Sequence, residues 1–143
     1  MAATRIHHIN FVVRDLDAAA RAFEQLLGLD PFETVEHAPR GATIARSKVG
    51  DSWIMLVRPH DAESVPGRFL AEHGEGFFLL SVGSADLRAD LERLMREGIE
   101  TRDKQPRQGL FDWSVADIAE AYGAVLHLTD DRDKSPDGNG SKR

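Results

Sequence analysis

Two histidines stand on segments with the composition of β-strands, and their imidazole rings are the clearest candidates for chemistry in this sequence. His8 lies in a segment of β-branched and aromatic residues from Ile6 to Val13, and His127 lies in the segment from Val125 to Thr129. Imidazole can ligate a metal ion, form directed hydrogen bonds, or act as an acid or base near neutral pH. A histidine on a strand can also be an ordinary core residue, so the elements around the two rings decide which role applies.

Because side chains alternate between the two faces of a strand, the neighbours of each histidine can be predicted. In the first strand the more apolar set, which includes Phe11 and Val13, should lie under a following helix, and His8 and Asn10 then face the other way. The same reasoning in the other strands gives a mostly apolar wall with a few polar groups, which is the usual composition of a small-molecule pocket. The predicted pocket residues are His8, Asn10, Trp53, Met55, Phe77, Leu79 and His127.

The elements that would hold these residues occur twice along the chain. After the first strand, Asp15 can cap a helix with apolar residues at helical spacing, and Gly28 can end it. A second strand and a similar helix, which Gly98 can end, follow later in the chain. Alignment of Val13 with Val82 and of the two glycines relates two copies of about 70 residues each.

Each copy continues with three further strands. These are expected at 32–36, 42–49 and 53–57 in the first copy, and at 99–104, 111–115 and 125–129 in the second. The sequence therefore predicts an α+β fold in which two tandem β-α-β-β-β modules, at about 5–58 and about 76–129, form one cup from their curved mixed sheets. A helix at about 65–73 would join the modules within this single domain of residues 1–129, and residues 130–143, which lack large apolar side chains, are expected to form a disordered tail.

Composition excludes several classes of function. The 143 residues carry 24 acidic and 18 basic side chains, a net charge of −6, which argues against a nucleic-acid surface. Cysteine is absent, which excludes disulfides and thiolate chemistry. No apolar run is long enough for a membrane span, and the first residues lack the pattern of an export signal, so we expect a cytoplasmic protein without a membrane partner.

The order of these elements resembles the vicinal oxygen chelate superfamily, which includes glyoxalase I, bleomycin-resistance proteins, extradiol dioxygenases and methylmalonyl-CoA epimerase. The opening from His8 to Leu16 is similar to the usual first strand and helix start of that superfamily. Arg58-Pro59 and the segment from Phe69 to Gly76 look most like the epimerase branch. The resemblance covers Arg5 to about Thr129, and it implies a small-molecule ligand and a homodimer.

In metal-using members of that superfamily, four strands each supply one ligand, typically His, then Glu or Gln, then His, then Glu. Carried over to this chain, the four positions fall on His8, Met55, Phe77 and His127. His8 fits and His127 is a potential ligand, but a thioether and a phenyl ring are unsuited to a hard divalent ion. The base of the epimerases would fall near Pro39, which cannot move a proton.

Two functions therefore remain open. The first is binding or sequestration of a small molecule in a mostly apolar pocket without metal or other cofactor, with the histidines as hydrogen-bond partners. The second is a divalent-metal-dependent isomerase, epimerase or lyase that acts through an enediolate, with His8 and His127 as metal ligands. The residues assign no catalytic group, so whether the chain is an enzyme stays open at this point.

Overall fold

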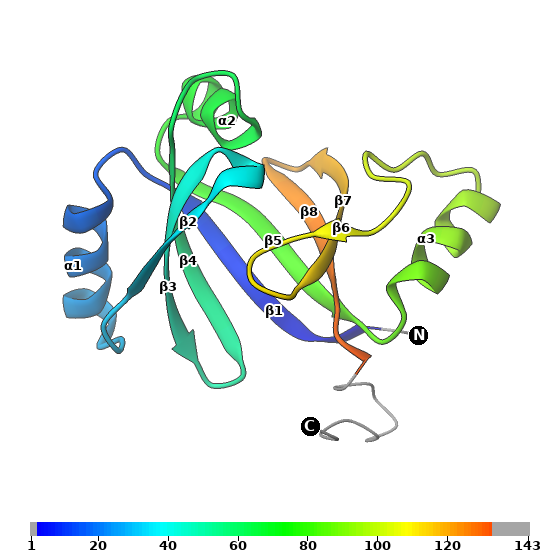
Figure 1. The fold of residues 1–143 in the computed structure, drawn as a ribbon, viewed down its shortest axis with the longest axis horizontal. Coiled ribbons are helices and arrows are strands. Elements are labelled where there is room, and N and C mark those ends of the chain that lie inside the picture. Colours follow the sequence, from blue (N-terminus) through cyan, green and yellow to red (C-terminus); the bar gives the residue numbers. More distant parts are fainter. Residues whose placement is uncertain (1–2, 133–143) are drawn as a thin grey trace. The chain divides into compact units, whose positions relative to one another are not determined.

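The computed structural model describes residues 3–132. Its elements in chain order are β1 (Ala3–Val12), α1 (Leu16–Leu27), β2 (Glu33–His37), the short 3-10 helix η1 (Ala38–Arg40), β3 (Ala42–Val49), β4 (Ser52–Pro59), α2 (Val65–His73), β5 (Gly76–Ser84), α3 (Leu87–Arg96), β6 (Arg107–Gln108), β7 (Ser114–Ala121) and β8 (Ala124–Asp130). Figure 1 shows these elements along the chain. Among residues 3–132, no helix is long and apolar enough to cross a membrane.

The order strand, helix, three strands occurs twice, and α2 separates the two copies. In the described part of the chain the strands form an eight-stranded sheet in the order β2-β3-β4-β1-β5-β8-β7-β6, so that in each copy the first strand neighbours the last. β1 runs parallel to β4, whereas the β3-β4 and β7-β8 pairs are antiparallel. The predicted α+β fold with doubled modules and a mixed sheet is thereby confirmed.

Contacts divide the described residues into two compact units. The N-terminal unit is His8–Leu79, and the C-terminal unit consists of residues 3–7 together with residues 80–132. Strands β1 and β5 each contribute residues to both units.

Each unit buries the apolar face of one helix against its own strands. In the N-terminal unit, Leu16 of α1 packs with Ala45 and Leu56 of the β3-β4 hairpin. In the C-terminal unit, Leu87 of α3 packs with Ala116, and Leu128 adds to this cluster from β8. Each helix thus covers one face of its strands, and the polar residues between these core positions point to the opposite face.

Two aspartates fix how the copies correspond. Asp15 accepts a hydrogen bond from the Ala18 amide at the start of α1, and Asp86 accepts one from the Ala89 amide at the start of α3. Matching these N-caps relates the copies by 71 positions, which also matches Leu16 with Leu87 and Ala45 with Ala116. The predicted alignment of Val13 with Val82 is therefore wrong by two residues, because β5 continues beyond Val82 to Ser84 before the chain turns.

The corrected correspondence changes the partner of His8. The counterpart of His8 is Leu79, and the counterpart of Ile6 is Phe77. Solvent exposure agrees with this assignment, because His8 and Leu79 are 3% and 2% exposed, whereas Ile6 and Phe77 are 48% and 40% exposed. In the second copy, the position equivalent to His8 is thus occupied by leucine and not by phenylalanine.

The segment predicted as a strand at 99–104 is not a strand. The Thr101 hydroxyl donates to the Asp103 carbonyl at 2.6 Å, and the Asp103 carboxylate accepts from the Asp117 amide at 2.8 Å. Hydrogen bonds between side chains and backbone of this kind compete with a regular ladder. The edge strand forms later, as the two residues of β6.

The strand predicted at 111–115 begins later and is longer. Phe111 has a φ angle of 55°, a turn conformation that no strand residue adopts, and β7 starts only at Ser114. It continues to Ala121, where Tyr122 and Gly123 both have positive φ angles and close the hairpin to β8. The sequence prediction missed residues 116–121 of β7, which alternate only weakly between apolar and polar.

The fold extends past the predicted end at Thr129. Asp130 ends β8, and the Asp131 carboxylate accepts hydrogen bonds from Thr4 Oγ1 at 2.7 Å and from Arg5 Nε at 2.8 Å. The first residues assigned to the tail therefore take part in the fold. Residues 133–143, the rest of the predicted tail, lie outside the described part of the chain.

Asp131 should make acid stability depend on this contact. Burial raises the pKa of its carboxyl, but the hydrogen bonds from Arg5 and Thr4 and the charges of Arg5 and His7 outweigh burial and lower the pKa below its usual value. A carboxyl with a lowered pKa stabilises the fold above its unfolded pKa of about 3.9, and this contribution is lost as the pH falls through the folded pKa.

We expect Asp131→Asn to reduce the free energy of unfolding at pH 7 by about 1.5–3 kcal/mol, the range for hydrogen bonds to a charged group. Urea titrations at a series of pH values should show this difference shrinking below about pH 4. Asp112→Asn, at an exposed aspartate of the same unit, is the control and should have little effect. A difference between the Asp131 variant and the natural protein that is the same at every pH would contradict this account.

Candidate functional site

In the N-terminal unit, six side chains lie in register across three neighbouring strands. His8 of β1 is paired with Trp53 of β4, which is paired with Lys48 of β3. One step along the strands, Asn10 is paired with Met55, which is paired with Arg46. Residues paired in this way point to the same face of a sheet. We call this set, which lies opposite the α1 core, the β1-β4-β3 face.

Solvent exposure on this face is low at β1 and Met55 and higher toward the β3-β4 turn. His8, Asn10 and Met55 are 3%, 6% and 2% exposed. Trp53 is half-buried, and Lys48 is exposed. The face thus has a closed side, formed by β1 and Met55, and an accessible side, formed by Trp53 and β3.

Two cations stand over the indole ring of Trp53. The guanidinium carbon of Arg46 lies 3.9 Å from the ring centroid, and Lys48 Nζ lies 5.2 Å from it. Arg46 Nε also lies 3.4 Å from the Glu33 carboxylate on the neighbouring strand β2. Attraction between a cation and the face of an indole ring is worth about 0.5–1 kcal/mol at exposed sites and more where water is excluded. The arrangement fixes Trp53 and Arg46 together.

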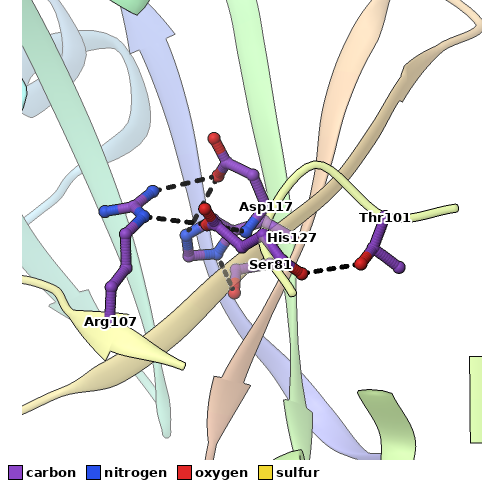
Figure 2. Close-up of polar contacts among 6 residues, drawn as sticks. Ser81, Thr101, Arg107, Asp117 and His127 are labelled. Carbon is purple, nitrogen blue, oxygen red and sulfur yellow. Dashed lines mark hydrogen bonds and ion pairs between the residues drawn. The ribbon is translucent and has the colours of Figure 1, made fainter. Parts of the chain in front are cut away.

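In the C-terminal unit, His127 belongs to a buried chain of polar groups (Figure 2). Its Nδ1 lies 2.7 Å from Ser81 Oγ, and Ser81 Oγ lies 2.7 Å from Thr129 Oγ1. On the other side of the ring, His127 Nε2 lies 3.7 Å from Asp117 Oδ1. Ser81 and Thr129 are both fully buried.

The partners of His127 favour one tautomer. A carboxylate only accepts hydrogen bonds, so the side of the ring that faces Asp117 favours a proton on Nε2. Nδ1 then accepts from the Ser81 hydroxyl, which in turn accepts from Thr129. Because the Ser81 hydroxyl is fully buried, it orients His127 and is not accessible as a nucleophile.

Asp117 is itself held by an ion-pair network. Arg107 of β6 places Nη2 at 3.2 Å from Asp117 Oδ1 and Nε at 2.8 Å from Asp103 Oδ2. The Asp117 amide donates to the same Asp103 carboxylate, as described above. Figure 2 shows the guanidinium of Arg107 against Asp117 beside the His127 ring. Two carboxylates thus offset the charge of Arg107, although its buried Nη2 makes an ion pair with Asp117 without a hydrogen bond.

The structure agrees with the predicted alternation at four of the pocket residues. The register places His8, Asn10, Trp53 and Met55 on one face. Leu79 is buried in β5. That these residues line a ligand pocket, and that His127 faces the same space, stays a prediction.

Phe77 differs from its predicted place in the pocket wall. Its ring centroid lies 5.7 Å from that of Phe11, and Phe11 packs with the α1 core. Phe77 is also 40% exposed. The corrected correspondence accounts for the exposure of Phe77, since its counterpart is the exposed Ile6 and not His8.

Sequence reasoning missed the charged groups of both units. Arg46 and Lys48 could have been found, because a tight turn at Gly50-Asp51 places them opposite Met55 and Trp53 once the strands alternate. Asp117 had no such signal, because a register shift between Asp117 and Ala119 interrupts the β7-β8 pairing.

The donor set does not fit the four-ligand metal site that the family resemblance implies. With the corrected correspondence, the four positions are His8, Met55, Leu79 and His127. Met55 and Leu79 are both 2% exposed, and they offer a thioether and a hydrocarbon, neither of which suits a hard divalent ion. Three of the four positions, His8, Met55 and Leu79, lie in the N-terminal unit, and only His8 offers a nitrogen donor. A catalytic zinc ion normally has three protein ligands.

Comparison with known proteins agrees with this fold. A protein of Bacillus subtilis (strain 168) named "Uncharacterized protein YqjC" is 28% identical over 128 residues, which are 87% of this chain and 90% of that protein. Methylmalonyl-CoA epimerase in complex with methylmalonyl-CoA and NH4+ superposes with a TM-score of 0.85 at 26% identity, over 94% of this chain and 99% of that one.

Two further epimerase structures are similar. An epimerase variant from Streptomyces coelicolor, in complex with 2-nitronate-propionyl-CoA, gives a TM-score of 0.83 at 27% identity over 90% and 95% of the two chains. The enzyme from Mycobacterium tuberculosis gives 0.83 at 26% identity over 90% and 89%. A sequence model of the Glyoxalase/Bleomycin resistance protein/Dioxygenase superfamily matches residues 7–116. On the doubled module and this match, the chain belongs to the glyoxalase/bleomycin resistance/dioxygenase superfamily.

Proposed function

We propose that this protein binds a small molecule at the β1-β4-β3 face without a divalent metal, and that its role is binding or sequestration. The observation that carries the proposal is the burial of Met55 and Leu79 at two positions where metal-using relatives place ligands. Apolar groups there stabilise an apolar ligand by about 25 cal/mol per Å² of ligand surface removed from water, before the costs of association. Homodimer formation, which the family resemblance implies, is part of the same proposal.

The similarity to methylmalonyl-CoA epimerases supports the fold and a small-molecule ligand, but shared fold alone does not carry a reaction to this chain. The position near Pro39, where the epimerases place a base, has no acidic residue. Glu36, the acidic residue closest to Pro39 in sequence, is paired with Thr43 of β3, and the Thr43 hydroxyl lies 3.0 Å from its carboxylate. Ile44 is two residues from Arg46, the partner of Met55, so Ile44 lies on the Met55 face. Thr43 is the neighbour of Ile44 on the same strand, and its side chain therefore points to the opposite face.

Asn10 supplies independent support for a site on this face. Its Oδ1 is buried and has no hydrogen-bond partner among the described residues. An unpaired buried acceptor costs about 1–3 kcal/mol. A residue that lowers the stability of the fold, as the unpaired Asn10 does, is typical of binding sites, where function and stability compete.

The equivalent positions Asn10 and Ser81 should respond to substitution with opposite signs. Asn10→Leu removes an unpaired acceptor, so we expect an equal or higher melting temperature. Ser81→Ala removes a hydroxyl that bonds both His127 and Thr129, so we expect a loss of about 1–3 kcal/mol. Thermal and urea unfolding of both variants measure this. Comparable destabilisation by the two substitutions would show that the Asn10 amide is fully satisfied.

The metal-free account predicts the metal content of the protein and of a designed variant. Protein purified without chelator should contain far less than one equivalent of zinc, nickel, cobalt, manganese or iron by elemental analysis. Met55→Glu combined with Leu79→His adds two donors to His8 within the N-terminal unit, and this variant should gain cobalt and zinc binding. Met55→Glu combined with Phe77→His is the control and should gain none, because Phe77 lies against Phe11.

Calorimetry and the cobalt absorption spectrum report binding, and circular dichroism reports folding. One tightly held equivalent of metal in the natural protein, lost in His8→Ala, would contradict the proposal. Equal metal binding by the two designed variants would contradict the correspondence of His8 with Leu79.

The direct experiment is a thermal-shift screen with small aromatic and acyl compounds. A ligand at 100 times its Kd should stabilise the protein by about 2.7 kcal/mol. Trp53→Ala should weaken binding of each hit by about tenfold or more, equivalent to about 1.4 kcal/mol. Trp113→Ala is the matched control, because Trp113 lies in the C-terminal unit against His7. Hits that lose affinity only in the Trp113 variant would place the ligand site elsewhere.

A further inference from the structure

We propose that the ligand of the β1-β4-β3 face is an acid, and that Arg46 and Lys48 bind its anionic group at the edge of Trp53. The inference rests on the proposed function and specifies the class of ligand. It follows from three properties of this face, which are the position of the two cations, the unbalanced charge of Lys48 and the accessibility of the indole ring.

The first property is position. Arg46 and Lys48 are two residues apart on β3, so both side chains point to the face that carries Trp53 and Met55. The guanidinium lies 3.9 Å from the centre of the indole ring, and the ammonium lies 5.2 Å from it. Two cations at one aromatic ring repel each other, and an anion between them removes that repulsion.

The second property is charge. Glu33 is the carboxylate that faces Arg46, at 3.4 Å from its Nε, and the Glu33 side chain is 61% exposed, so solvent weakens this pair. Lys48 makes no ion pair with any carboxylate within residues 3–132. Lys48 therefore leaves a positive charge on this face, in a protein whose net charge is −6. A local positive charge of this kind attracts an anionic ligand to this face.

The third property is accessibility. The Arg46 side chain is 13% exposed and is held by Trp53 and Glu33, so little conformational entropy is lost when it binds an anion. Trp53 is half-buried, and Lys48 is exposed. An aromatic or acyl body can thus contact the open part of the indole ring while its anionic group lies between the two cations. The ligand class is therefore a small aryl or acyl acid.

Matched acids and amides test this inference, because each pair differs only in the anionic group. We suggest phenylacetate with phenylacetamide, indole-3-acetate with indole-3-acetamide, and hexanoate with hexanamide. The chain has two tryptophans, so in Trp113→Phe the quenching of tryptophan fluorescence reports on Trp53 alone. Melting temperatures give an independent measure of binding for the indole pair.

We expect the acid of at least one pair to bind about tenfold more tightly than its amide. Arg46→Met and Lys48→Met should each weaken the acid severalfold and leave the amide unchanged. Higher salt should weaken only the acid, because exposed charges are screened. Lys104→Met is the matched control, since Lys104 is an exposed lysine of the C-terminal unit and is paired with Glu100.

The outcomes separate this inference from the proposed function. Equal binding of acids and amides overturns the acid preference and leaves a neutral-ligand pocket standing. An acid preference that persists when Arg46 and Lys48 are both methionine also overturns the inference, because the anion then binds elsewhere. Absence of binding by every member of the three pairs overturns both proposals for aryl and acyl ligands.

Discussion

The candidate site depends on the register of three strands more than on any single contact. Because side chains alternate along a strand, a slip of one residue between β1 and β4 would move His8 and Asn10 away from Trp53 and Met55. The opposite face prevents this slip, since Leu56 and Ala45 are fully buried beneath α1 and would then have to face away from the helix. The hydrophobic core under α1 thus determines which polar groups meet on the other side.

The same scaffold carries different chemistry in its two copies. Asn10, unpaired in the N-terminal unit, corresponds to Ser81, which is fully bonded in the C-terminal unit. Arg46, which stacks on an indole ring, corresponds to Asp117, which pairs with Arg107. Met55 is paired with Arg46 and His127 with Asp117, so these two also correspond, although the register shift between Asp117 and Ala119 makes their separation 72 and not 71 positions. Core positions such as Leu16 and Leu87 stay apolar in both copies. Packing constrains the helix-facing residues of each copy, while the opposite face is free to differ.

The sequence predicted the fold class and most elements because their signals are local. The Asp15 cap, the apolar spacing of α1 and the glycine at position 28 mark one helix without reference to the rest of the chain. The errors arose where tertiary contacts decide. The segment at 99–104 forms side-chain hydrogen bonds around Asp103 in place of a strand, and β5 extends two residues beyond the end that Val82 suggested. A two-residue error preserves the alternation of faces, so the predicted face of Leu79 does not depend on it, while Phe77 was matched with the wrong partner.

The most direct test of the account is whether a ligand reaches Trp53. In protein labelled with 5-fluorotryptophan, the two tryptophans give two fluorine resonances, which the Trp113→Phe variant assigns. Titration with an aryl acid such as indole-3-acetate should shift or broaden the Trp53 resonance in a saturable manner and leave the Trp113 resonance in place. A saturable change at Trp113 with none at Trp53 would contradict the account, because the ligand would then bind away from the face that β1, β4 and β3 form.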